Sequence, residues 1–193
     1  MNYPLTLTFK TIALAPQISV TDADGRLIFY LKQQLFKLKE AVNVFADKEQ
    51  ANLLFTINAD RIIDFSAQYH FRSAAGADLG SVKKRGMKSL WKAHYDIFDG
   101  SILAMEVGEE NPWIKLLDGI FSGIPVLGMF SGYVFHPAYL VSRQGSAVMR
   151  IQKLPAFFEG RFEITKDGTL NEAEETRALL SLLMMALLEK SRG

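Results

Sequence analysis

The feature that most constrains the fold of this chain is its C-terminal segment, which is apolar on every side of a helix. Residues 178–188 read ALLSLLMMALL and contain no charged residue, glycine or proline. A helix of this length spans about 16 Å, whereas a bilayer core is about 30 Å thick. An all-round apolar helix that is too short to cross a membrane is typical of a protein interior. We therefore expect a central helix over about residues 171–190.

The start of this helix is marked by its polar residues. Asn171 and Glu174 have the spacing of a capping box, in which each side chain satisfies a backbone N–H of the first turn. Glu172, Glu174 and Glu175 lie where the helix dipole favours negative charge. The helix is therefore expected to begin close to Asn171.

The rest of the chain is dominated by short runs in which apolar and polar residues alternate. The first run places Leu5, Leu7 and Phe9 on one face and polar residues on the other. Turn residues such as those at 22–25 and 99–100 separate the runs and predict hairpins. A many-stranded antiparallel sheet can bury an apolar helix by closing around it. The prediction is a mainly β single domain over residues 1–193: about twelve strands, between about residues 3 and 165, form a closed antiparallel barrel wrapped around a hydrophobic C-terminal α-helix.

The composition of the chain limits the kinds of partner and site that we expect. The formal net charge is +1, so no global field indicates a nucleic-acid partner. The chain has no cysteine, which excludes disulfides, thiolate metal sites and a cysteine nucleophile. The first residues lack the basic region and continuous apolar run of a secretory signal. We expect a cytoplasmic protein that can be peripheral to a membrane.

The predicted architecture resembles the tubby-like C-terminal fold, which tubby, the phospholipid scramblases and the plant LURP-one-related proteins share. The resemblance to the LURP-one and scramblase branch lies in three stretches: VTDADGRLIFYLKQQLFKLKEAVNVFAD, FSAQYHFRSAAGADLGSVKKRGMKSLWKAHYDIFD, and the last strand running into an acidic and then apolar helix. It covers most of the chain as an order of elements and includes no diagnostic catalytic motif. The cysteine-rich and proline-rich features of animal scramblases are absent, so the resemblance does not imply lipid scrambling.

An apolar insert, over about residues 109–132, interrupts the strand pattern. The segment between Asp118 and Arg143 contains no Lys, Arg, Asp or Glu, and its glycines and prolines argue against one continuous spanning helix. Such a segment either packs across a barrel end or contacts a membrane or a second subunit. Trp113, Phe121 and Phe130 are the candidates for such a contact, since aromatic side chains suit a bilayer surface.

The densest positive charge lies in the sequence KKRGMKSLWK, which is expected to form one hairpin. If Val82 and Trp91 face the core, strand alternation directs Lys83 and Lys92 outward. Tubby domains hold phosphoinositides, and the resemblance implies that this cluster could bind a phosphorylated head group through charge-assisted bonds. The alternative is a solvated hairpin whose lysines protect a sheet edge from pairing. The candidate head-group ligands are Lys83, Lys84, Arg85, Lys88 and Lys92.

Catalytic and metal-binding patterns are weak. The sequence lacks a nucleophile elbow, a P-loop, a dinucleotide fingerprint and a zinc-protease motif. His70 and His94 fall on outward strand faces, and His136 precedes a proline. Scramblases have an acidic calcium segment before the last helix, but helix capping explains the glutamates here equally well. The calcium candidates are Asp167, Glu172, Glu174 and Glu175, and we expect neither a bound metal nor a cofactor.

Two functions follow as hypotheses. The first is a non-enzymatic tubby-like module that binds anionic lipid head groups or a membrane surface. The second is a barrel with a small-molecule or enzymatic site, which requires an interior that the helix does not fill. A protein-interaction module or a homodimer formed through the apolar insert is a further alternative.

Overall fold

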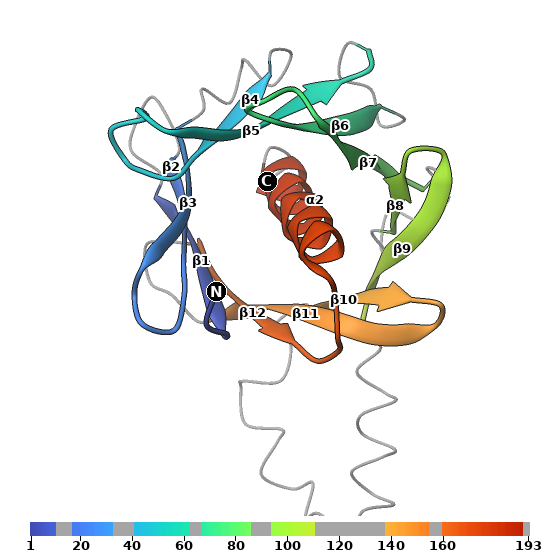
Figure 1. Cartoon of the computed structure of the whole chain (residues 1–193). Helices are drawn as coiled ribbons and strands as arrows, with labels where there is room; N and C mark the ends of the chain where they lie inside the picture. Colours follow the sequence, from blue (N-terminus) through green and yellow to red (C-terminus); the bar gives the residue numbers. More distant parts are fainter. Residues whose placement is uncertain are drawn as a thin grey trace, which may run out of the picture.

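The structure is a computed structural model that describes residues 1–10, 17–32, 41–61, 67–85, 94–110, 138–154 and 160–190. Within these residues twelve antiparallel strands form one closed barrel around a C-terminal helix (Figure 1). The predicted fold class is therefore confirmed. The elements are β1 (Leu5–Lys10), β2 (Gln17–Thr21), β3 (Leu27–Lys32), β4 (Val42–Phe45), β5 (Leu53–Ala59), β6 (Gln68–Ser73), β7 (Asp78–Lys84), β8 (Tyr95–Asp99), β9 (Ile102–Glu109), β10 (Ala138–Arg143), β11 (Ser146–Leu154), β12 (Gly160–Lys166) and α2 (Glu172–Lys190).

The barrel is a meander in which each strand pairs with its neighbours in the sequence. The ring closes where β1 pairs with β12, for example at Leu5 opposite Ile164 and Thr6 opposite Glu163. Closure leaves no strand with an unpaired edge in this sheet. It also places β7 across the barrel from β1, since β7 is six strands away from β1 in either direction around the ring.

Strand alternation decides which side chains face the interior. On β1, the inward Leu5, Leu7 and Phe9 are almost fully buried, and the intervening threonines are partly exposed. Tyr95 and Ile97 of β8 are buried in the same way. The core is therefore assembled from one face of every strand.

Helix α2 occupies the interior of the barrel. Every residue from Ala178 to Leu188 is buried, including Ser181, whose hydroxyl donates a hydrogen bond to the carbonyl of Arg177. Figure 1 shows the helix inside the ring of strands, where it contacts β7 and β8. The all-round apolar sequence is explained because strands surround the helix on all sides.

The two ends of the barrel differ in their connections. The turn end carries short described turns and the start of α2: residues 22–26, 46–52, 74–77, 100–101, 144–145 and 167–171. The rim end is the opposite end, toward which α2 runs. At the rim end β1, β3, β5, β7, β9 and β11 finish, and the strands that follow them begin.

Candidate functional site

The interior of the barrel is occupied by protein side chains. Leu180, Leu182 and Met184 of α2 are fully buried, as are Phe71, Ile97 and Met149 on three different strands. These side chains belong to one continuous apolar core. Because α2 fills the space that a ligand-binding barrel leaves open, the described residues leave the outer surface and the two ends of the barrel as the places where a partner can bind.

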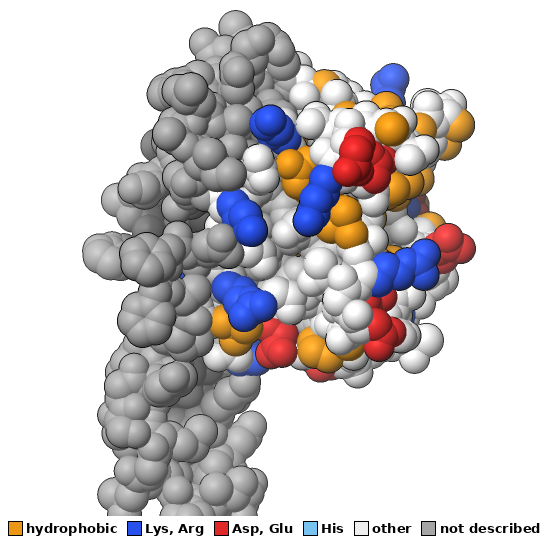
Figure 2. Space-filling view, turned by 90° about the vertical axis from the view of Figure 1, so that its left-hand side faces the viewer, with side chains coloured by type: hydrophobic (Ala, Val, Ile, Leu, Met, Phe, Trp, Pro, Cys, Tyr) orange, Lys and Arg blue, Asp and Glu red, His pale blue; other side chains and the backbone are white. Residues whose placement is uncertain are grey.

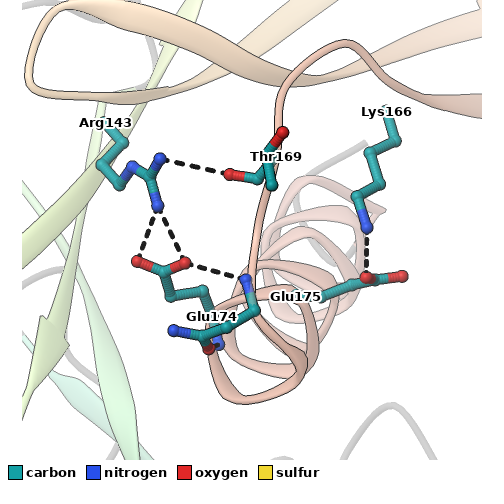
Figure 3. A network of polar contacts seen from close by, with 6 residues as sticks. Arg143, Lys166, Thr169, Glu174 and Glu175 are labelled. Atoms are coloured by element: carbon teal, nitrogen blue, oxygen red, sulfur yellow. Dashed lines mark hydrogen bonds and ion pairs between the residues drawn. The ribbon is translucent and has the colours of Figure 1, made fainter.

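At the turn end, a network of ion pairs holds the first turn of α2 (Figure 3). The Arg143 guanidinium lies 2.8 Å from both carboxylate oxygens of Glu174 and donates a 3.1 Å hydrogen bond to the carbonyl of Thr169. Glu174 also accepts from the N–H of Asn171, and its own N–H donates to the Asn171 side chain. The predicted capping box is therefore present. The backbone hydrogen bond from Asn171, followed by the Arg143 side chain, lowers the pKa of Glu174.

Glu175 is paired on the other side of the same turn. Its carboxylate binds the Lys166 ammonium and accepts a 2.8 Å hydrogen bond from the Tyr3 hydroxyl. Burial, and then the Glu175 carboxylate, raise the pKa of Tyr3, so the phenol stays protonated as a donor. The network links the residues before β1, the end of β10 and the end of β12 to α2, and so anchors the helix in the barrel.

These contacts account for two of the four calcium candidates. Glu174 and Glu175 are committed to Arg143 and Lys166, while Asp167 and Glu172 lie nearby without an ion pair to any described residue. Across the described ranges, no three His, Cys, Asp or Glu side chains are grouped so that they could hold a metal ion. The arrangement fits the capping interpretation of the acidic segment.

Arg177 is a buried cation whose role was missed from the sequence. Its side chain is only 6% exposed, its Nε donates a 2.7 Å hydrogen bond to the carbonyl of Leu79, and its Nη2 lies 2.8 Å from Asp99. Gly80 makes room for it, since a Cβ there would lie 2.6 Å from Arg177 Nε. The sequence contains two signals that could have indicated this contact: Gly80 lies inside a strand, and Arg177 directly precedes the apolar part of the helix.

Of the predicted basic hairpin, the structure describes Lys83, Lys84 and Arg85, and these lie on two faces of the barrel. Lys83 points outward and is partly exposed, because Val82 faces the core. Lys84 shares the inward face, and its Nζ lies 5.8 Å from the ring centroid of Tyr95. Arg85 binds Asp96 and Glu106 on the outer face, which raises its pKa. Arg85 therefore has its charge compensated within the protein.

The suggestion that these lysines protect a sheet edge is wrong for β7. This strand pairs with β6 along one side and with β8 along the other. A strand paired on both sides has no open ladder that charge must guard. Edge protection therefore does not explain the positive charge at Lys83.

A second group of basic residues, not singled out from the sequence, lies across the barrel from β7. We name Lys10, Lys32, Lys153 and Arg161 the basic rim; all four are exposed at the rim end of adjacent or nearby strands. Lys10 and Lys32 flank Gln17 in one cross-strand row. Arg161 pairs with Thr8, two residues before Lys10 on the same face. Sequence reasoning missed this group because its members are far apart in the chain.

Charge is sorted between the two ends of the barrel. Lys32, Lys153 and Arg161 form no ion pair with another described residue. At the rim end, Asp60 is paired with Arg61 and Glu110 with Arg150, whereas the exposed Glu109 has no ion pair with a described residue. On the face in Figure 2, several Lys and Arg side chains lie together on one half, and acidic side chains are more frequent toward the other. At the turn end, acidic residues without an ion pair to a described residue outnumber basic ones: the acidic residues are Asp22, Asp24, Asp47, Glu49, Asp78, Asp167 and Glu172, and the basic ones are Arg26, Lys48 and Arg72.

The remaining candidate residues have the following positions. His70 lies on the outer face of β6 between the buried Tyr69 and Phe71, as expected. The ring of His94 lies over Gly108 of β9. Five candidates fall outside the described residues, as does His136: Lys88, Lys92, Trp113, Phe121 and Phe130.

In the part of the chain that the structure describes, no helix combines the length and the apolar character needed to cross a bilayer. Comparison of the chain with protein-family models, with curated proteins and with solved structures finds no match. The residues and their geometry therefore carry the functional argument alone.

Proposed function

We propose that this protein is a non-enzymatic, tubby-like module of the LURP-one and scramblase type that binds anionic membrane surfaces. The resemblance in sequence pattern suggests the family, and the twelve-stranded barrel with its C-terminal helix is the architecture that the resemblance implies. The filled interior supports a function on the outer surface. No step of covalent chemistry is part of the proposal.

The observation that carries this proposal is the sorting of unpaired charge along the barrel. Among charged side chains without an ion pair to a described residue, basic ones outnumber acidic ones at the rim end, and acidic ones outnumber basic ones at the turn end. A chain with a formal net charge of +1 gains attraction for an anionic surface only through such a local arrangement. Each basic residue close to an anionic bilayer contributes about 1 kcal/mol.

The test is co-sedimentation with lipid vesicles. The protein should sediment with phosphatidylcholine vesicles that contain phosphatidylserine and remain in the supernatant with phosphatidylcholine alone. Raising the salt concentration should release it, because the screening length is only about 8 Å at 0.15 M salt and about 3 Å at 1 M. Equal sedimentation with both kinds of vesicle, or none at low salt, would contradict the proposal.

The role of the basic hairpin is tested separately. Charge reversal at Lys83, Lys84 and Lys92 should weaken vesicle binding, while Arg85 should contribute less because Asp96 and Glu106 neutralise it. Melting curves of the variant serve as the control for folding. Unchanged binding would show that the hairpin is only a solvated surface.

A further inference from the structure

We infer that the rim end of the barrel faces the anionic bilayer and that the basic rim, Lys10, Lys32, Lys153 and Arg161, is its principal contact. This inference rests on the proposed function and adds the residues and the orientation. The partner to which it commits is a continuous anionic lipid surface, which offers phosphate and carboxylate groups over a wide area.

The first step is the geometry of the basic rim. Lys10 and Lys32 are two strands apart in one row, which corresponds to about 10 Å, and Arg161 follows on the next strand. Lys153 lies opposite Phe162, the residue after Arg161, so it is on the inward side of the rim, whereas Lys10, Lys32 and Arg161 are on its outer side. The four cations therefore follow an arc of the rim at β3, β1, β12 and β11. A set of charges spread along an arc suits many small head groups better than one enclosed ligand.

The second step is the position of Lys83 on the opposite wall. Twelve strands with a spacing of about 4.8 Å and a tilt of about 40° enclose a barrel about 24 Å across. If either wall lay flat on a bilayer, the other wall would stand about three screening lengths away at 0.15 M salt. The electrostatic attraction between the basic groups of that wall and the bilayer would then be about one-twentieth of its value at contact. The basic groups of both walls reach one flat surface together only when the rim end faces it.

The third step concerns the acidic turn end. The wall that carries the basic rim continues to the turn at residues 22–26, where Asp22 and Asp24 outweigh the single positive charge of Arg26. Flat docking of this wall would bring this net negative turn against an anionic surface. With the rim end toward the bilayer, the acidic turns point away from it, and repulsion is reduced by distance.

The decisive variants compare the two ends at equal change of charge. The rim triple variant is Lys32→Gln, Lys153→Gln and Arg161→Gln. The matched control removes three exposed basic residues near the turn end: Arg26→Gln, Lys48→Gln and Arg72→Gln. Both sets lose three positive charges, and none of the six residues forms an ion pair with a described residue. Both variants should have melting temperatures close to that of the wild type.

With phosphatidylserine-containing vesicles, the rim triple variant should bind at least about tenfold more weakly than the wild type, while the control should change by less than about threefold. Equal losses in the two variants would mean that only net charge matters and would overturn the inference, although the proposed function would stand. If the wild type itself does not bind at low salt, the proposed function fails and the inference fails with it.

A second measurement reports the orientation directly. Since the chain has no cysteine, Gln17→Cys and Ala23→Cys each create a single labelling site, at the rim end and the turn end of one hairpin wall. Energy transfer to acceptor lipids should be stronger from the label at position 17 than from the label at position 23. Equal transfer from both positions on vesicles that bind the protein would indicate flat docking and would overturn the inferred orientation.

Discussion

At the scale of single residues, the packing of Arg177 depends on the absence of a side chain at Gly80. Gly80 has φ +103°, and a Cβ there would lie 2.2 Å from the carbonyl oxygen of Phe98 as well as 2.6 Å from Arg177 Nε. Arg177 also binds the Leu79 carbonyl and Asp99, so the buried guanidinium cannot move away without losing these partners. The backbone conformation and the close contacts therefore both require glycine.

Gly80→Ala is expected to lower the free energy of unfolding by about 3 kcal/mol, since backbone strain and overpacking combine. The matched control is Gly145→Ala, where φ is +81° but no atom lies within 4 Å of the added Cβ. The control should lose about 1 kcal/mol from backbone strain alone. Urea denaturation of both variants measures the difference. Equal losses would mean that Arg177 and the Phe98 carbonyl do not restrict the site.

Glu174 provides a pH-dependent test at the same scale. Its pKa in the folded state is lowered by the Asn171 backbone and by Arg143. Because the pKa of Glu174 is lower in the folded state than in the unfolded state, its carboxylate stabilises the folded state at pH values above the ordinary carboxyl pKa. This stabilisation is lost as the pH falls through the folded-state pKa. Stability should therefore decline between about pH 5 and pH 2.

Glu174→Gln should reduce this decline and leave a variant that is less stable at pH 7. The effect should be modest because the pair is partly exposed to solvent. The measurement is urea denaturation of the wild type and the variant across the pH range. A variant whose acid sensitivity equals that of the wild type would show that the Glu174 carboxylate, with its Asn171 and Arg143 partners, does not contribute.

At the scale of elements, α2 behaves as the core of the barrel. It is apolar around its whole circumference because β strands surround it, and its charged residues are limited to its first turns and its last residues. The polar network of Arg143, Lys166 and Tyr3 fixes the helix at its start. Burial of the apolar segment supplies the main stabilisation, and the network sets its axial position.

Leu183→Asp should prevent folding, since an unpaired carboxylate inside the core costs several kcal/mol. Leu183→Ala should fold and lose about 2–5 kcal/mol, which provides a quantitative value from urea denaturation. The control Ile102→Asp places the same charge at a residue that is 70% exposed and should change stability little. If the Leu183→Asp protein folds and melts cooperatively, the burial of α2 in the core is contradicted.

At the scale of the whole molecule, closure joins the two most distant parts of the strand sequence. Residues of β1 pair with β12 over five positions, from Leu5 opposite Ile164 to Phe9 opposite Gly160. This pairing removes both sheet edges and encloses the helix. Closure also brings Lys10 and Arg161 together, so the same contact that completes the barrel assembles the basic rim.

A disulfide provides a direct test of closure. Thr6 and Glu163 are paired across β1 and β12, so Thr6→Cys with Glu163→Cys places two Cα atoms about 4.5–5.5 Å apart, within the range of a disulfide. The bond should form on mild oxidation and raise stability by about 2–4 kcal/mol. The control is Thr6→Cys with Ser142→Cys, on strands that are not neighbours. Failure of the first pair to cross-link, or equal cross-linking of the control, would contradict the closed barrel.

Much of the architecture could be predicted from local patterns. Alternation in β1 and the apolar run of α2 depend on periodicity alone, which is visible in one sequence. The capping box of Asn171 and Glu174 is a contact over three residues and was also correctly predicted. The candidate site was harder to predict: Lys83 points outward as expected, whereas Lys84 turns inward and Arg85 is neutralised by residues on β8 and β9.

The burial of the helix and the single apolar face of the surrounding strands could be predicted from residue type and spacing alone. Which charges remain without an ion pair, and where they gather, depends instead on the three-dimensional fold. Lys32 and Arg161 are far apart in the chain, and strand pairing brings them to one rim. The physical reason is that electrostatic attraction depends on distance in space, which is set by the register and the closure of the barrel and not by separation along the sequence.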